Sequence, residues 1–495
     1  MDTKYKTINC FICLLMMLFF ATTTAKAQEE YEKWLKKQQQ AFQEFKDKRD
    51  KEFTEFLKKE WRKMQLFEGI KRDEKPKPKK MPVAEKLPPR DIKPQKIRII
   101  KDIPLPKYVP PVEPDLEEKP EPMDIDKSES MQLNFLDTPL KMHYDRVLKV
   151  PTSNAITKET ISAYWSAMSR ADYESILNRA QYFRKKLRLN DWGYAYLLYK
   201  IGEDMYPDSL NQRKLFVWFM LSKSGYEAKI GHTSDSIYLL LPSVNFMYSV
   251  PYLTIDNKKY FVVSFEGKPE LVKTLYTYEG RYPNADKEIN LKIEALPNIK
   301  TNVASKKLKF SYRGKEYTLT VKYNKNVVNF FQNYPQTNLE VYFDAPVSPD
   351  ANYSLLSALR PIVNGKSETE AVNVLLRFVQ TAFDYQTDRD QFGKEKYFFS
   401  EETLFYPYSD CEDRAILFAY LVSNLLRLEV IGLDYPGHIA TAVHFTDDIK
   451  GDYVMYRHKK FIICDPTYIN ADLGMSIPEV KNATPEVLEI SFSMR

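Results

Sequence analysis

Three residues near the end of the sequence have the types that a nucleophilic cysteine site needs. They are Cys411, His438 and Asp465, in that order along the chain. In such a site a thiol attacks a carbonyl, an imidazole takes and returns the proton, and a carboxylate holds the imidazole. The stretch that contains them, residues 408–468, therefore predicts a nucleophilic cysteine site.

The residues around Cys411 predict the start of a helix. Ser409 followed by Glu412 fits a capping box, with Ser409 as the N-cap and Cys411 as the second helical residue. The positive end of the helix dipole favours a thiolate there, and the unpaired N–H groups favour an oxyanion. Asp410, Glu412 and Asp413 oppose this, because like charge raises the pKa of a thiol. A reactive Cys411 thus needs an imidazolium to hold its thiolate.

Strand periodicity selects His438 as the partner of Cys411. His438 and His444 share one face of a predicted strand but lie roughly 20 Å apart at about 3.3 Å per residue. A returning strand and a Pro-Gly turn bring His438, not His444, back to the cysteine end. To orient His438, the strand that ends at Asp465 must run antiparallel to the histidine strand. Residues 453–456 must then be an excursion rather than the neighbouring strand.

These pieces together resemble the transglutaminase-like, papain-related cysteine hydrolases. The match consists of Cys411 in SDCEDR, His438 in PGHIATAV and Asp465 in FIICDPTY, preceded by a family-like segment at 375–406. It extends over residues 354–480. The resemblance implies a papain-like α+β fold, packing a helix on an antiparallel sheet, and a Cys-His-Asp triad for acyl transfer or amide hydrolysis.

The expected activity is hydrolysis of a peptide or carboxamide bond. The backbone N–H of Cys411 and a second donor, for which Gln391 is the candidate, would stabilise the oxyanion. Hydrolysis is favoured over cross-linking because the sequence shows no second site for a lysine. No cofactor is expected. A metal site made of Cys411, His438, His444 and Asp465 is an alternative without tight ligand spacing to support it.

A second class of function fits the same sequence. The chain could be a non-catalytic binding or scaffold protein of the cell envelope that keeps the fold without the chemistry. Reactivity of the Cys411 thiol would separate the two classes.

The first 27 residues predict a signal peptide. Lys4 and Lys6 precede an apolar run at 11–21, and Ala25-Lys26-Ala27 forms an A-x-A cleavage site. The mature chain would be exported, to the periplasm, the cell surface or the medium, without an integral membrane span; a retained anchor is the alternative. Cleavage leaves two cysteines, Cys411 and Cys464, whose predicted positions argue against a disulfide.

An amphipathic helix and a proline-rich linker follow. Residues 28–70 place aromatic and aliphatic residues at three- and four-residue steps. This stripe could form a coiled coil by self-association, dock on the folded body, or contact a membrane surface, and a partner helix is the preferred reading. Residues 71–130 carry many prolines and charges and predict an extended arm or plain disorder.

The remainder predicts a multidomain α+β protein. Its expected parts are an α+β domain at 131–265, an antiparallel β domain at 266–353 and the transglutaminase-like domain at 354–495. At an offset of 201, residues 210–264 share seven identities with the catalytic stretch, and the triad positions become Leu210, Ile237 and Ser264. Two explanations stay open: residues 210–264 are a degenerate first copy of the catalytic stretch, or the two segments share a similar alternation of residues by coincidence.

Charge excludes one class of partner. The net charge of +6 comes mostly from the signal, the helix and the linker, so the globular part is close to neutral. A nucleic-acid partner is therefore not expected, and a protein or peptide substrate is.

Overall fold

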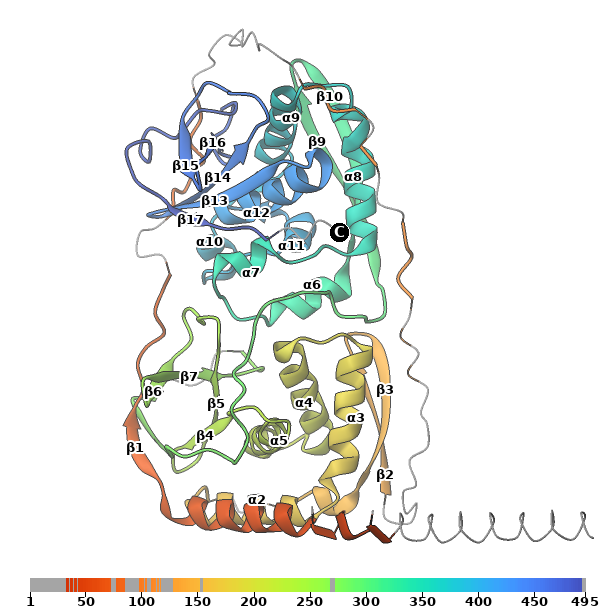
Figure 1. Ribbon diagram of the computed structural model, residues 1–495, viewed down its shortest axis with the longest axis vertical. Helices are drawn as coiled ribbons and strands as arrows, with labels where there is room; N and C mark the ends of the chain where they lie inside the picture. The colour runs from red at the N-terminus through yellow and green to blue at the C-terminus, as the bar shows by residue number, and fades with distance from the viewer. Residues whose placement is uncertain are drawn as a thin grey trace, which may run out of the picture.

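The protein is a mixed α+β chain of two stacked bodies, each built around a large hydrophobic core (Figure 1). The computed structural model describes residues 33–34, 36–38, 40–41, 43–72, 77–84, 98–101, 103–104, 108–112, 114, 116, 128–151, 155–267 and 272–491. The predicted signal peptide, residues 1–27, lies outside these residues. Among the helices described, none is both long enough and apolar enough to cross a bilayer.

Four consecutive helices form one half of the first body. They are α2 (Lys158–Arg170), α3 (Tyr173–Lys186), α4 (Asp191–Met205) and α5 (Leu210–Lys223). Each is preceded by a polar N-cap whose side chain accepts a hydrogen bond from the third helical N–H; the caps are Thr157, Asp172, Asn190 and Ser209. Local sequence therefore determines where each helix starts.

A six-stranded sheet forms the other half of the first body. Its strands are β1 (Arg62–Gln65), β4 (Lys229–His232), β5 (Ile237–Pro242), β6 (Tyr252–Ile255), β7 (Lys258–Val263) and β8 (Thr274–Thr277), in the order β1-β8-β4-β5-β7-β6. A separate hairpin of β2 (Ser128–Phe135) and β3 (Thr138–Asp145), followed by a 3-10 turn (Arg146–Leu148), packs on α3 and α4.

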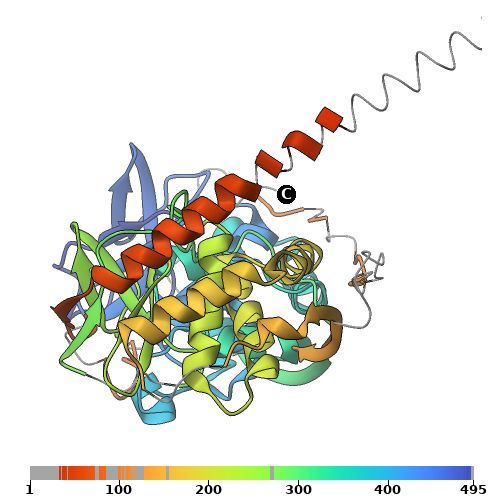
Figure 2. The same ribbon diagram turned by 90° about the horizontal axis from the view of Figure 1, so that it is seen from below.

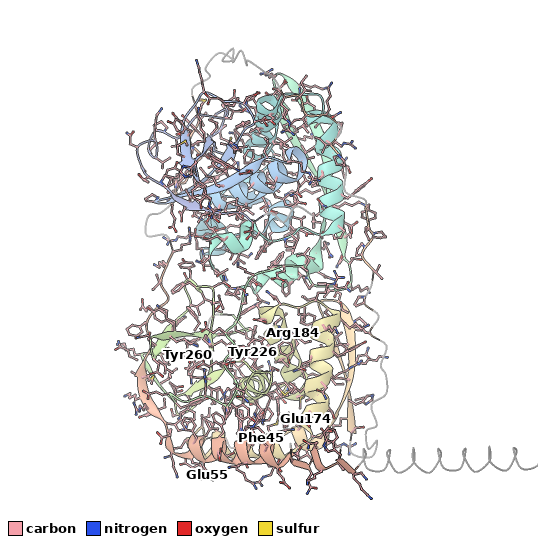
Figure 3. The ribbon with its side chains drawn as sticks, in the orientation of Figure 1. Phe45, Glu55, Glu174, Arg184, Tyr226 and Tyr260 are labelled. Atoms are coloured by element: carbon pink, nitrogen blue, oxygen red, sulfur yellow. The ribbon has the colours of Figure 1, made fainter. Side chains whose placement is uncertain are left out.

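The amphipathic helix docks on the chain's own first body, where a partner helix was preferred. It covers residues 43–59 and crosses the base of that body beside α2 (Figure 2). Phe53 is 4% exposed and lies 4.6 Å from Trp165 of α2 between ring centroids. Figure 3 shows Phe45 and Glu55 on the same helix. The helix ends at 59, not 70, because the next residues pair with β8 as strand β1.

The second body contains the candidate site. Its helices are α6 (Lys325–Gln332), α7 (Leu339–Phe343), α8 (Pro349–Val363), α9 (Glu368–Thr381), α10 (Asp388–Phe392), α11 (Ser400–Phe405) and α12 (Cys411–Leu421), the last continued by a π-helical turn (Val422–Leu426). Its sheet has the order β15-β16-β14-β13-β17, with β13 (Glu429–Tyr435), β14 (His438–His444), β15 (Tyr453–Tyr456), β16 (Lys459–Cys464) and β17 (Glu486–Leu488). Helix α12 packs against β14 and β13.

The stretch expected to be an antiparallel β domain contains one two-stranded hairpin in the described residues. Its strands, β9 (Val303–Tyr312) and β10 (Lys315–Asn324), follow the predicted alternation. Their inward residues Leu308, Phe310, Leu319 and Val321 belong to the core of the second body. β8, which lies in the same stretch, joins the first sheet. The hairpin packs on α8 and α9 because two strands alone do not enclose a core.

Candidate active site

Cys411 is the first residue of α12, and Asp410, not Ser409, is the N-cap. The backbone N–H of Asp410 donates to Asp413 Oδ2 at 3.1 Å, so the capping box lies one residue later than predicted. Ser409 is used differently. It lies in the short strand β12 (Tyr408–Ser409), and its hydroxyl accepts a hydrogen bond from Arg414 Nε at 3.1 Å.

Arg414 fixes the start of α12 against the end of α9. Its guanidinium is fully buried and donates to the carbonyls of Gln380 at 3.0 Å and Phe383 at 2.7 Å. The side chain of Gln380 in turn donates to the carbonyl of Asp465 at 3.1 Å. The cysteine helix and the aspartate strand are thus both tied to the same end of α9.

His438 and Asp465 form a buried pair, as their order and strand positions predicted. His438 Nε2 lies 2.7 Å from Asp465 Oδ2, and β14 and β16 are antiparallel neighbours. β15 pairs with β16 rather than β14, so residues 453–456 are an excursion at the sheet edge. Asp465 Oδ1 accepts hydrogen bonds from the backbone N–H and hydroxyl of Thr467 at 2.9 and 2.8 Å. The carboxylate is therefore held at both oxygens.

Asp465 is the charged member of this pair. Burial acts to raise the pKa of Asp465, but the charge and hydrogen bond of His438 and the donors of Thr467 outweigh it and lower that pKa. With Nε2 bonded to Asp465, Nδ1 is the ring nitrogen left to take a proton from a thiol.

The thiol of Cys411 donates its hydrogen bond to a neighbouring carboxylate and not to this pair. It is 2% exposed, and its Sγ donates to Glu412 Oε2 at 3.0 Å. Among the described residues, no hydrogen bond links Cys411 to His438. Burial, then the charge of Glu412, raises the pKa of the thiol well above its usual value, and Asp410 adds to this, while Lys77 acts the other way.

A lysine from the proline-rich stretch fills the space beside Cys411. Lys77 Nζ lies 2.8 Å from Asp410 Oδ2 and 3.7 Å from Asp388 Oδ2, and it forms ion pairs with Glu412 and Glu395. Its side chain is 6% exposed. Asp410, Glu412, Asp388 and Glu395 are called the carboxylate pocket below.

Sequence reasoning missed this arrangement. Lys77 and Asp410 are 333 residues apart in the chain, and nothing local in the linker marks Lys77 among its neighbours. The acidic residues around Cys411 in the run 410–413 were the available signal.

The remaining predicted residues are placed as follows. Gln391 lies on α10, and its amide nitrogen is buried without a hydrogen-bond partner in the described structure; no hydrogen bond joins it to Cys411. His444 Nδ1 lies 2.9 Å from the carbonyl of Lys460. Within the described residues, Cys411, His438, His444 and Asp465 do not gather as metal ligands, whereas the carboxylate pocket does bring its oxygens within 4.8 Å of one another. Cys411 and Cys464 are both free and buried.

Comparison of the chain with protein-family models, curated proteins and solved structures finds no match. The geometry of the site therefore carries the functional argument.

Proposed function

We propose that this protein is an exported, transglutaminase-like cysteine hydrolase that acts on peptide or carboxamide bonds. The observation that carries the proposal is the buried His438–Asp465 pair, formed between antiparallel strands. The same α9 end anchors both this pair and the start of the cysteine helix. A histidine held by a buried carboxylate is one part of the arrangement that nucleophilic catalysis uses, and Cys411 at the start of α12 would supply the nucleophile.

The chemistry follows from the roles of the three side chains. Cys411 Sγ exchanges its hydrogen bond to Glu412 for one to His438 Nδ1, which takes the thiol proton as Sγ bonds to the carbonyl carbon. The oxyanion is stabilised by the Cys411 backbone N–H at the helix start. His438 then protonates the leaving amine, and water, deprotonated by His438, releases the acid from the thioester. Asp465 holds the imidazole throughout.

Water is the proposed acyl acceptor, although a lysine does lie beside Cys411. Burial lowers the pKa of Lys77, but Asp410, Glu412 and Asp388 raise it more, so the net pKa lies well above the usual value. An ammonium held in this way is protonated and is not a nucleophile. Its presence does not favour cross-linking over hydrolysis.

A non-catalytic binding or scaffold protein is the second candidate. It is favoured by the raised pKa of Cys411 and by the hydrogen bond of its thiol to Glu412. Strand alternation favours it too. Ile439 and Val443 of β14 face the core that α12 shares, and Ala440 and Ala442 pack on the opposite face of the sheet. By alternation His438 belongs to that opposite face, away from α12.

Alkylation of the thiols distinguishes the two candidates. The chain from residue 28 would be treated with iodoacetamide across a pH series, and modification of Cys411 and Cys464 would be read separately by peptide mass. Because a buried thiol reacts only in molecules whose site has opened, the pH profile reports the open site. Cys464 is the internal control, since burial raises the pKa of its thiol.

For a hydrolase, we expect the opened Cys411 to react well below pH 7, and we expect His438→Ala and Asp465→Asn to remove that component. A Cys411 profile that follows an ordinary thiol, near the reference pKa of about 8.5, and that ignores both substitutions would reject the triad and leave the binding protein.

A further inference from the structure

Residues 77–84 (the strap) lie along the second body as an extended chain. Tyr385 Oη donates to the carbonyl of Pro78 at 2.6 Å. Further along, the N–H of Ile469 donates to the carbonyl of Pro82 at 2.9 Å, and the N–H of Ala84 donates to the carbonyl of Ile469 at 2.8 Å, in a parallel β-bridge. Ile469 comes shortly after Asp465 in the chain. The strap thus runs from the start of α12 to the loop that follows the triad aspartate.

Most of these contacts do not depend on the strap's side chains. Backbone pairing of the kind seen at Ile469 is how sheets and loops capture extended peptides of varied sequence. Two side chains do contribute. Ala84 is buried in a small apolar cluster with Tyr468, and the ammonium of Lys77 enters the carboxylate pocket, with the ring of Tyr397 5.3 Å away. Lys79, two residues on, is exposed. Lys77 therefore provides the charge selectivity of this contact.

The carboxylate pocket is suited to a cation, and Lys77 does not pair with all of its oxygens. Four carboxylates face one ammonium, and Asp410 Oδ1 is buried with no hydrogen-bond partner among the described residues. Asp410 and Glu412 are themselves fully buried. Ionising these buried carboxyl groups together is costly without a cation, so the pocket favours one. The ammonium found there is part of an extended peptide segment.

We propose that the carboxylate pocket is a binding site for a basic side chain of an extended peptide, and that Lys77 of the strap fills it as an intramolecular competitor. The inference deepens the proposed function, on which it rests in taking that peptide as the substrate. It assigns the substrate a lysine, or a similar cation, close to the bond that Cys411 attacks. It also accounts for the 2% exposure of Cys411, since the occupant covers the nucleophile.

The first experiment vacates the pocket and refills it. In Lys77→Ala, n-butylammonium chloride should raise the thermal midpoint in a saturable way, by several degrees, because it carries the missing ammonium on the same alkyl chain. The same salt should not shift the midpoint of wild type or of Lys79→Ala, and n-butanol should not shift that of Lys77→Ala. If Lys77→Ala folds poorly, refolding yield with and without n-butylammonium gives the same readout.

The second experiment supplies the peptide in trans. A fluorescein-labelled peptide with the sequence of residues 77–84, KPKKMPVA, should bind Lys77→Ala at least tenfold more tightly than Lys79→Ala. Replacing its first lysine with norleucine, or adding Asp388→Asn and Glu395→Gln to the protein, should abolish the gain.

The proposal fails if n-butylammonium does not stabilise Lys77→Ala, or if the peptide binds both variants equally. It also fails if Ca²⁺ or Mg²⁺ stabilises Lys77→Ala and n-butylammonium does not, since the pocket is then a metal site. Neither experiment reads the reactivity of Cys411, so failure here and failure of the hydrolase proposal are separate results.

Discussion

The charge balance around Cys411 makes the stability of this site depend on pH. Burial, and after it the charge of Asp410, raises the pKa of Glu412 from 4.5 to about 8. Burial likewise raises the pKa of Asp388 and of Asp413 well above the usual range. Between pH 4.5 and about 8, the folded chain keeps a proton on Glu412 that the unfolded chain has released. Stability must therefore fall as the pH rises through this window.

Glu412→Gln should flatten this dependence. Glutamine has no proton to lose, so the variant should lose less stability than wild type between pH 5 and 8, by up to about 1.4 kcal/mol per pH unit. Urea unfolding at a series of pH values measures it. Glu429→Gln is the matched control, because Glu429 is exposed and pairs with Lys459 on the sheet surface. Equal slopes for wild type and Glu412→Gln would show that Glu412 is ionised in the folded chain across the window.

Sequence reasoning identified the residues whose positions depend on local pattern and order. Alternation along two strands was enough to pair His438 with Asp465. It failed at Ser409, because the pairing of β12 with β11 (Asp384–Tyr385) and the contact with Arg414 draw that residue out of the cap. It had no means to find Lys77, whose site is assembled from distant segments of the chain.

The two bodies repeat one arrangement of elements. Omitting the added strand β1, the first sheet has the order β8-β4-β5-β7-β6 and the second β17-β13-β14-β16-β15, in matching succession after α5 and α12. Leu210 and Cys411 each begin their helix, and Ile237 and His438 each begin the second strand after it. This is the order that the repeat hypothesis requires, with Leu210, Ile237 and Ser264 replacing the triad.

Gly231 and Gly432 form one of the seven identities at the offset of 201, and this identity has a structural reason. A Cβ on Gly231 would lie 2.6 Å from the side chain of Leu275 in β8, and one on Gly432 would lie 3.1 Å from that of Leu488 in β17. Each glycine admits a leucine from the equivalent neighbouring strand. The sequence alone showed the identity but not the leucine, since β8 and β17 are short strands in long irregular stretches.

Arg213 and Arg414 are a further identity at the offset of 201, and they give a prediction at the scale of the helices. Arg414 and Arg213 each occupy the fourth helical position and donate to carbonyls at the C-terminal end of an earlier long helix; Arg213 Nε donates to the carbonyl of Tyr206 at 2.9 Å. Arg414→Met should destabilise the second body by about 3 kcal/mol or more, because it leaves several buried carbonyls unpaired. Arg213→Met should cost less, since Arg213 is partly exposed and its carbonyls can reach water. Urea unfolding followed by far-UV circular dichroism compares them, and equal losses would contradict the explanation.

At the scale of the whole molecule, segments that looked separable are part of the fold. The helix of residues 43–59 fills the base of the first body, and Asp50 on it pairs with the buried Lys223. Parts of the proline-rich stretch then follow the second body, at the strap and again where the N–H of Ile100 donates to the carbonyl of Lys366 at 2.8 Å. Composition predicted that these residues could not build a core, which is correct, but it does not reveal that they pack on one.

Docking of the helix can be tested with one buried and one exposed phenylalanine. Phe53→Ala should destabilise the first body by about 3–5 kcal/mol, because it leaves a cavity against Trp165. Phe45→Ala, at a side chain that is 54% exposed, should change stability by less than about 0.5 kcal/mol. All five tryptophans, at positions 34, 61, 165, 192 and 218, precede the second body, so tryptophan fluorescence during urea unfolding reports the first body alone.

The result distinguishes between the surfaces on which the aromatic stripe of helix 43–59 could pack. A helix packed on its own body makes the two substitutions unequal and leaves the difference independent of protein concentration. A helix that pairs with a second chain would instead make the Phe53→Ala loss grow with protein concentration, because the wild type alone would gain from association. Equal and small losses would mean that the helix does not contribute to the first core, and the contact of Phe53 with Trp165 would then have to be abandoned.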